Sequence, residues 1–379
     1  MGAFMMRIGT TFGVLSAILL VCSLEPTAAP EPAPISSLPS SAQPHTKRQG
    51  HRGTSLEDGR VLFIGGYMDD RGAELYDPPS GRWLKLDASQ RGRTGTSAVT
   101  LLDGRVLLMN GFGQRDVNPH DDYWIPEPVA EVFDPSSLTF TTVSPPSVGM
   151  SAPQAVRLKD GRVLLWGCTD SEAAHVEVYE PSRDAWTVLA SPPDCAASSK
   201  LVAMDEGAML TAGFQKPNYI FDAAGGSWKT ASMSPLRRQS KALRFPDNRV
   251  LILGRPSVLD QGPHAAVYDS TSDQWVPTGP LTRVFTDTIN GDFTLVNHQG
   301  KALLLGGSLE RPGRCTETVE ALDLASLTWS ATRPLSQPRG RHSVNVLPDR
   351  SLLIEGGYGT SPESGECRYL RGDFEIYTP

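Results

Sequence analysis

A short apolar run recurs seven times along the chain, and each copy begins with a polar turn. The copies read DGRVLFIGG from Asp58, DGRVLLMNG from Asp103 and DGRVLLWGC from Asp160, with weaker versions from Glu206, Asp247, Gln299 and Asp349. An Asp-Gly pair is a strong hairpin signal because Gly adopts positive φ at little cost. The run after it has the length of a fully buried strand. Each copy therefore predicts a tight hairpin whose second strand lies in the core.

A second motif follows six of the seven runs and consists of two large side chains spaced seven residues apart. The pairs are Tyr76 and Trp83, Phe133 and Phe140, Tyr179 and Trp186, Phe221 and Trp228, Tyr268 and Trp275, and Leu322 and Trp329. The Asp-Pro-Ser type of stretch between them is turn chemistry, so each unit is predicted to hold four short strands. The unit repeats every 41 to 57 residues. One such sheet cannot bury both of its faces, so we expect the sheets to pack radially around an axis.

These motifs resemble the Kelch repeat, with its Gly doublet, its Tyr-Asp before a Trp, and Arg and His at the start of the inner strand. The resemblance covers residues 48–379 and is to exported, bacterial-type Kelch proteins of the DGRVLxxGG variety. It implies an all-β fold, a seven-bladed Kelch-type β-propeller similar to the propeller of galactose oxidase. The copper site of that enzyme uses two His and two Tyr, one Tyr being cross-linked to Cys. No Tyr-His pair occurs in this sequence, so we expect the fold without the copper site.

The last unit ends at Pro379, before its second aromatic residue. We predict that a strand at residues 35–38 (ISSL) completes the last blade and removes a free sheet edge. The alternative is a three-stranded last blade with a disordered segment at residues 30–47.

Charge and composition narrow the class of partner. The chain carries 42 Asp and Glu against 35 Lys and Arg, a net charge of −7, whereas nucleic-acid binding needs clustered Lys and Arg. The sequence also lacks a phosphate-binding loop, a dinucleotide fingerprint and a serine nucleophile elbow. We therefore expect no nucleic-acid partner, no cofactor and no metal, and we expect a monomeric propeller.

The N-terminal 22 residues predict a signal peptide. Arg7 precedes an apolar stretch at residues 12–21, which is shorter than the roughly 20 residues that span a bilayer. Two endings stay open: Cys22 is lipidated as in a lipoprotein, or a signal peptidase cuts near Ala29. Residues 23–47 are rich in Pro, Ser and Ala and predict a flexible tether. We expect an exported protein, secreted or held in the cell envelope (periplasmic or lipid-anchored), with membrane contact only through that anchor.

The remaining four cysteines fit an oxidising compartment. The repeat map places all four on one face of the propeller, in loops of adjacent blades. On that map we predict two disulfides, Cys168–Cys195 and Cys315–Cys367.

Binding residues are expected on the face formed by the loops between second and third strands and by the crossovers between blades, because these loops vary most. Four arginines on this face stand ten residues before the Asp-Gly position, with a fifth beside them: Arg48, Arg93, Arg237 and Arg339, and Arg341. Converging guanidinium groups hold carboxylates or phosphates bidentately, so this register predicts an anion site. The alternative is that these arginines pair with acidic residues of a neighbouring blade.

Two further groups on this face are candidate ligand contacts. His51 and His342 share a register seven residues before the Asp-Gly position, and they either contact a ligand or cap the inner strands. The long loop of the second unit brings together His120, Tyr123 and Trp124. That loop is either a binding lip or a solvated loop with Trp124 packed on a blade.

The predicted function is binding: an exported Kelch-repeat scaffold for a protein or glycan ligand, anionic if the arginine register holds it. The alternative is an enzyme similar to the exported Kelch epimerases that act on sugar acids. Such chemistry needs only an acid and a base, which Glu310, Glu355 and His342 could supply. No spacing singles them out, so we assign no catalytic residue.

Overall fold

A computed structural model describes residues 40–66, 72–87, 95–114, 124–126, 128–169, 171, 173–192, 198–212, 216–256, 263–282, 292–308, 314–361, 367–370 and 372–379. The chain divides into two units, Met1–Glu31 and Pro32–Pro379, and every described residue belongs to the second. The predicted signal peptide, Cys22 and residues 35–38 lie outside the described residues. The described residues form strands and turns, and they include no helix long and apolar enough to cross a membrane.

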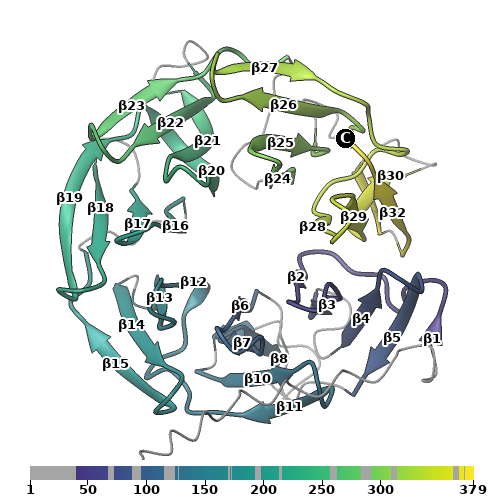
Figure 1. The fold of residues 1–379 in the computed structure, drawn as a ribbon, viewed down its shortest axis with the longest axis horizontal. Helices are drawn as coiled ribbons and strands as arrows, with labels where there is room; N and C mark the ends of the chain where they lie inside the picture. Colours follow the sequence, from purple (N-terminus) through teal and green to yellow (C-terminus); the bar gives the residue numbers. More distant parts are fainter. Residues whose placement is uncertain are drawn as a thin grey trace, which may run out of the picture. The chain divides into compact units, whose positions relative to one another are not determined.

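Seven antiparallel sheets, numbered here as blades 1 to 7 in chain order, surround a common axis within the described residues (Figure 1). This confirms the predicted all-β, seven-bladed propeller. Consecutive strands run from the inner to the outer edge of each blade. The strands of blades 1 to 3 are β2 (Arg52–Ser55), β3 (Val61–Ile64), β4 (Ala73–Asp77) and β5 (Arg82–Leu86); β6 (Ser97–Thr100), β7 (Val106–Met109), β10 (Ala130–Asp134) and β11 (Thr139–Thr142); β12 (Ser151–Arg157), β13 (Val163–Cys168), β14 (Ala174–Glu180) and β15 (Ala185–Leu189).

The remaining blades repeat this order. Their strands are β16 (Lys200–Ala203), β17 (Gly207–Thr211), β18 (Pro217–Asp222) and β19 (Ser227–Met233); β20 (Leu236–Arg244), β21 (Val250–Pro256), β22 (Ala265–Asp269) and β23 (Gln274–Pro277); β24 (Thr294–His298), β25 (Lys301–Leu305), β26 (Val319–Asp323) and β27 (Thr328–Ala331); β28 (Ser343–Val346), β29 (Leu352–Glu355) and β32 (Phe374–Tyr377). Two hairpins extend the loops of blades 2 and 7: β8 (Phe112–Gln114) with β9 (Trp124–Pro126), and β30 (Tyr358–Thr360) with β31 (Cys367–Leu370).

The seven-residue spacing places the two large side chains directly opposite each other across the third and outer strands. Tyr76 is the register partner of Trp83, and their rings lie 4.9 Å apart. The same cross-strand stacking recurs in blades 2 to 5. Such aromatic pairs stabilise a sheet because facing side chains on neighbouring strands are in contact.

The turn at the start of the apolar run connects blades 1, 3 and 5 to the next blade through its arginine, as well as forming a hairpin. In blade 1, Asp58 accepts hydrogen bonds from the backbone N–H and the guanidinium of Arg60. Arg60 then donates to the carbonyl oxygen of Pro135 in blade 2. Arg162 makes the corresponding bond from blade 3 to Ala223 of blade 4. The arginine of the motif therefore links the turns of adjacent blades.

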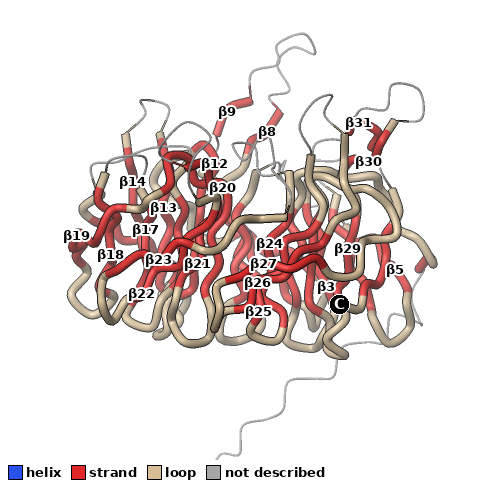
Figure 2. The backbone as a smooth tube through the Cα atoms, turned by 90° about the horizontal axis from the view of Figure 1, so that it is seen from above, coloured by secondary structure: helices blue, strands red, loops and turns tan. Residues whose placement is uncertain are grey.

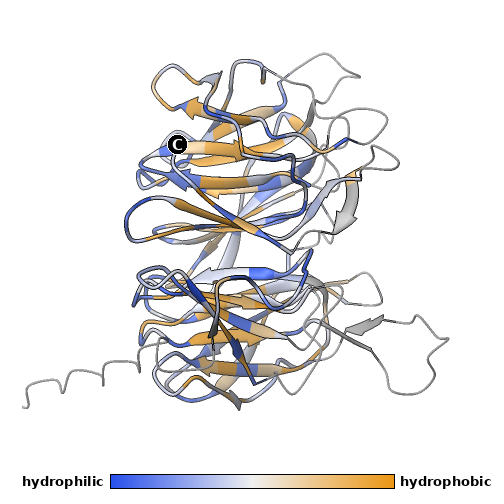
Figure 3. Ribbon diagram, turned by 90° about the vertical axis from the view of Figure 1, so that its right-hand side faces the viewer, coloured by the Kyte–Doolittle hydropathy of each residue, from blue (hydrophilic) through white to orange (hydrophobic). Residues whose placement is uncertain are grey.

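Apolar residues are concentrated in the strands (Figure 3). Their side chains form seven buried clusters, one at each interface between neighbouring blades. The cluster between blades 7 and 1 includes Phe63, Trp83 and Leu353. Trp83 is fully buried and meets Phe374 of blade 7 edge to face, with ring centroids 5.3 Å apart. The ring is therefore closed by side-chain packing between the first and last blades.

The N-terminal strand among the described residues pairs with blade 1, while the strand predicted to complete blade 7, at residues 35–38, lies outside them. β1 (Ser40–Ser41) lies antiparallel to β5 as a fifth strand of blade 1, and the described part of blade 7 has three strands. Just after β1, the backbone N–H of His45 donates to the buried carboxylate of Glu74. Ser147 makes the same bond to Glu177 in the crossover from blade 2 to blade 3. The N-terminal segment therefore enters blade 1 as an ordinary crossover does.

The extended loops gather on one face of the propeller, where the hairpins β8–β9 and β30–β31 project (Figure 2). On this face the Cys315–Cys367 disulfide joins blades 6 and 7, with Cα atoms 4.8 Å apart, and confirms that predicted pair. Cys168, at the end of β13, is also disulfide-bonded. Its predicted partner Cys195 lies outside the described residues.

Candidate functional site

Two of the predicted anion-binding arginines, Arg48 and Arg339, are buried and satisfy the protein's own polar groups. Arg48 is 1% exposed, donates to the carbonyl oxygens of Gly65 and Gly72 at 3.0 and 2.9 Å, and lies 3.5 Å from a Glu74 carboxylate oxygen. Arg339 is equally buried and lies 3.3 Å from Asp373 and 3.4 Å from Glu375. These acids belong to the same blade as each arginine, whereas the sequence suggested a neighbouring blade. Both side chains therefore hold the blade together and do not face a ligand.

Of the other three arginines of that group, Arg341 is the one whose side chain the structure describes. Arg341 is partly exposed, and its Nε lies 2.7 Å from Asp292 Oδ1. Its guanidinium lies 5.8 Å from the ring centroid of Tyr358. Arg237 lies in β20, where only its backbone is described, and Arg93 lies outside the described residues. The carboxylate of Asp292 thus balances most of the positive charge of Arg341.

The two predicted histidines are buried at the interfaces between blades. His51 Nε2 lies 2.6 Å from Glu355 Oε2, and both side chains are fully buried. Glu355 stands at a position where the other blades carry the apolar residues Ile64, Met109, Trp166, Ala212, Leu253 and Leu305. His51 of blade 1 and Glu355 of blade 7 thus form a polar contact across the interface that closes the ring.

His342 is the counterpart of His51 at the interface between blades 6 and 7, and its side chain carries no charge. Burial, together with the positive charges of Arg339 and Lys241, lowers the pKa of His342 to about 3. Its two ring nitrogens have no hydrogen-bond partner in the described part of the chain. His342 is therefore neutral at any physiological pH, and it supplies no positive charge to an anion.

The predicted binding lip of blade 2 is only partly described. Trp124 lies in β9 and its backbone pairs with Gln114 of β8, while its side chain is not described. His120 and Tyr123 lie outside the described residues.

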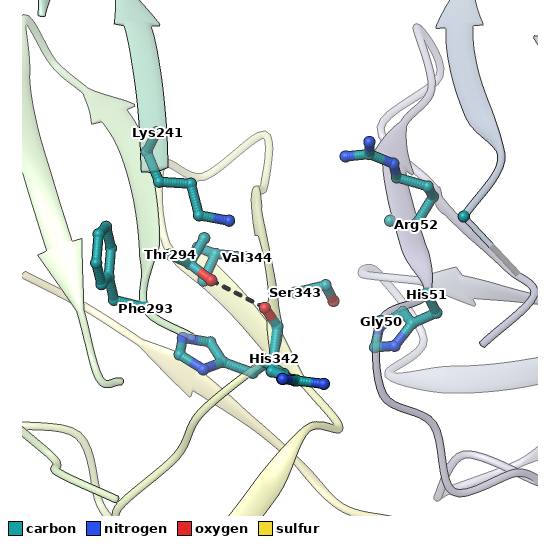
Figure 4. Close-up of a pocket in the computed structure, with 12 residues that line it drawn as sticks. Gly50, His51, Arg52, Lys241, Phe293, Thr294, His342, Ser343 and Val344 are labelled. Atoms are coloured by element: carbon teal, nitrogen blue, oxygen red, sulfur yellow. Dashed lines mark hydrogen bonds between the residues drawn. The ribbon is translucent and has the colours of Figure 1, made fainter. Parts of the chain in front are cut away.

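The structure reveals a different candidate site, a pair of cavities along the propeller axis. One has a volume of about 510 Å³ and the other about 360 Å³, and both are lined by Arg52, Gly95 and Lys241. We call this pair the axial channel. In Figure 4 the side chains of Arg52 and Lys241 point into the opening from opposite walls, above His342 and Thr294. The inner strands of blades 1 and 5 therefore aim two cations into one space.

Several residues that line this channel share one position in the repeat, a position that the sequence analysis did not use. The residues six positions before the Asp-Gly position are Arg52, Ser97, Gln154, Lys200, Lys241, Phe293 and Ser343. Six of them line the axial channel, all except Ser97. The register contains three cations and no acid. Arg48 and Arg339, which stand ten residues before the turn, lie farther back along the chain and donate to carbonyl oxygens of their own blades.

The channel walls alter the ionisation of its lysines. Burial, reinforced by the charges of Arg52 and Lys200, lowers the pKa of Lys241 to about 8, and Asp292 opposes that change. Burial likewise lowers the pKa of Lys200 to about 8, although its ammonium donates to the carbonyl oxygen of Ser199 at 3.1 Å. Both ammonium groups lose hydration in the channel, and a bound anion would restore the favourable interaction that water no longer provides.

Arg52 and Lys241 keep donors available to a ligand. Arg52 is exposed to the channel, and its Nε donates to the carbonyl oxygen of Thr96 at 3.2 Å, which fixes the guanidinium plane. Within the described part of the chain, the Lys241 ammonium has no hydrogen-bond or ion-pair partner. Among the described acids, Asp292 is committed to Arg341 and to the hydroxyl of Ser308. The channel can therefore accept an anionic group without first breaking an internal ion pair.

Comparisons with known proteins agree with the fold. No family model matches the sequence. Galactose oxidases of Gibberella zeae are 23% identical over 351 residues, which cover 86% of this chain and 44% of theirs. Beta-scruin of Limulus polyphemus and human Kelch-like protein 30 are each 28% identical over about a third of this chain. This chain thus spans less than half the length of the relatives it matches.

A solved structure described as a fungal alcohol oxidase of the AA5 family, in complex with copper, superimposes with a TM-score of 0.68 at 16% identity. The match covers 90% of this chain and 76% of that chain, and at this identity it shows the fold alone. Imidazole and thiolate side chains are common copper ligands. No group of three such residues gathers among the described residues, and the axial channel presents Arg52 and Lys241 instead. These side chains do not fit a copper ion.

Proposed function

Because the chain is a Kelch-type β-propeller, with a central opening lined by cations, we propose that it works by binding a carboxylate-bearing ligand in the axial channel. The observation that carries the proposal is the inner-strand register of Arg52, Lys200 and Lys241, which contains no acid and faces one space. The protein as a whole is acidic, with a net charge of −7. A cationic channel in an acidic protein attracts anions locally and repels them elsewhere.

The dimensions of the channel define the kind of ligand. Its larger cavity, about 510 Å³, falls among pockets that hold small molecules. An acidic sugar at the end of a glycan fits this space, as does the acidic side chain of a partner protein. The hairpins β8–β9 and β30–β31 project from one face of the propeller (Figure 2), and they would contact the rest of such a ligand.

An array of glycans and peptides tests the proposal. Purified protein is applied to matched anionic and neutral glycans and to acidic and amidated peptides, at low and at high salt. We expect binding to the anionic members that weakens with salt, because screening reduces the attraction. The Arg52→Met/Lys241→Met double variant should lose this binding and remain folded. Equal binding of anionic and neutral members, or none at all by a folded protein, overturns the proposal.

A second candidate is an enzyme that acts on a sugar acid, as in epimerisation. Lys241, with its pKa of about 8, is suited to accept and return a proton near neutral pH. Proton magnetic resonance in deuterium oxide would detect exchange at a ring carbon of a sugar acid. Exchange that Lys241→Met abolishes would favour the enzyme, and binding without exchange would favour the scaffold.

Export belongs to this proposal as well. The apolar stretch at residues 12–21 and the Cys315–Cys367 disulfide support it, because structural disulfides persist in oxidising compartments. Cell fractionation of the tagged full chain, with and without residues 1–22, would test it.

A further inference from the structure

We propose that Lys241 forms a reversible imine with ligands that carry both a carboxylate and an aldehyde or ketone, so that the axial channel captures anionic carbonyl compounds covalently. This inference rests on the proposed anion site and names a chemical subclass of its ligands. It concerns 2-oxo acids, glyoxylate-like aldehydes and the open-chain forms of sugar acids.

The first requirement for an imine is an amine that nothing else occupies. Lys241 lies in β20 and lines both cavities of the axial channel. Its ammonium has no hydrogen-bond or ion-pair partner in the described part of the chain. Lys200, the other channel lysine, already donates to Ser199. Lys241 is therefore the better placed of the two to meet a ligand.

The second requirement is a neutral amine, since the ammonium form is not a nucleophile. The charges of Arg52 and Lys200 favour loss of the Lys241 proton, and Asp292 opposes it. His342 lines the same cavity and is neutral. With its pKa near 8, about a fifth of Lys241 is neutral at pH 7.4, compared with about a thousandth for an ordinary lysine. Burial and the surrounding cations thus make a reactive lysine in an open cavity.

The third requirement is a group that orients the carbonyl compound. Arg52 points toward Lys241 across the opening (Figure 4), and its guanidinium plane is fixed by the bond to Thr96. A carboxylate bound to Arg52 would place the adjacent carbonyl carbon near the Lys241 amine. The neutral amine adds to the carbonyl to give a carbinolamine. Loss of one water then gives the imine, so the overall step is amine plus carbonyl to imine plus water.

Reductive trapping tests the inference on the purified full-length protein. Glyoxylate serves as the probe and cyanoborohydride reduces any imine, leaving a carboxymethyl group that peptide mass spectrometry locates. We expect Lys241 to be labelled at least tenfold faster than the surface residues Lys85 and Lys229, with a rate that rises as pH increases through about 8. Propionaldehyde, which lacks the carboxylate, should show a much smaller preference for Lys241.

Variants separate this chemistry from simple anion binding. Lys241→Arg cannot form an imine, so labelling in the channel should disappear while Lys85 and Lys229 are labelled at the wild-type rate. Arg52→Gln should reduce labelling by glyoxylate more than labelling by propionaldehyde. If oxalate binds but glyoxylate labels Lys241 no faster than Lys85, the imine is refuted and the anion site stands. If the folded protein binds neither, both proposals fail.

Discussion

Replacing Arg48 with Met should destabilise the protein strongly, although the sequence suggested a ligand-binding role for this residue. Arg48 is 1% exposed and lies beside Glu74, whose side chain is fully buried. Removing one partner of a buried ion pair costs about 3–5 kcal/mol because the other charge is left without compensation. The carbonyl oxygens of Gly65 and Gly72 also lose the hydrogen bonds that Arg48 donates. We expect the free energy of unfolding to fall by about 4 kcal/mol.

The loss should depend on pH in a defined direction. Burial already raises the pKa of Glu74 above its ordinary value of 4.5, and Arg48 opposes that rise. Without Arg48 the pKa of Glu74 rises further in the folded state. A carboxyl pKa that is higher in the folded state than in the unfolded state does not lower the stability at pH values below the unfolded-state pKa. The loss of stability grows as the pH rises from the unfolded-state pKa to the folded-state pKa. The Arg48→Met protein should therefore be closer to wild type at pH 5 than at pH 8.

Denaturant unfolding followed by tryptophan fluorescence measures both effects, with Arg52→Met as the matched control. Arg52 lies only four residues away but is exposed to the channel, so its replacement should leave stability nearly unchanged and weaken anion binding. A loss below about 1 kcal/mol for Arg48→Met, or equal losses for the two variants, would refute the structural role assigned to Arg48.

Three further outcomes follow from described contacts. Oxalate binding, measured by calorimetry, should weaken as pH rises through about 8, because Lys241 then loses the proton that attracts the anion; unchanged affinity up to pH 10 would contradict this. Trp83→Ala should lower the free energy of unfolding by about 3–5 kcal/mol, since Trp83 fills the interface that closes the ring; Val188→Ala on the exposed face of β15 is its control. The Cys315→Ser/Cys367→Ser variant should have a free energy of unfolding about 2–4 kcal/mol lower than wild type. A reducing agent should lower the stability of this variant less than that of wild type.

The fold was predictable because its signals are local and repeated. The Asp-Gly turn sets the hairpin, and the seven-residue spacing of Tyr76 and Trp83 sets the register of the two outer strands. Seven copies of a unit that cannot bury both faces alone leave few arrangements other than a ring. The pairing of Ser40–Ser41 with blade 1 was not predictable, because this two-residue strand has no motif of its own.

The anion site expected from the sequence draws on a different position of the repeat from the axial channel proposed here. Two of the arginines that stand ten residues before the turn, Arg48 and Arg339, are buried donors to carbonyl oxygens of their own blades. Arg52, Lys200 and Lys241 stand six residues before the turn, and a comparison of that position across the blades would have revealed them. The position of the repeat that faces the axis is set by the orientation of the inner strands. That orientation depends on packing between blades that lie far apart in the sequence.

The most direct test of the anion site is a calorimetric titration of oxalate into wild-type protein and into the Arg52→Met/Lys241→Met variant, at low and at high salt. Circular dichroism first confirms that both proteins are folded. We predict saturable binding to wild type that weakens with salt, and binding at least tenfold weaker to the variant. Equal affinity for the two proteins, at either salt concentration, would show that the axial channel is not the binding site and would contradict the proposed function.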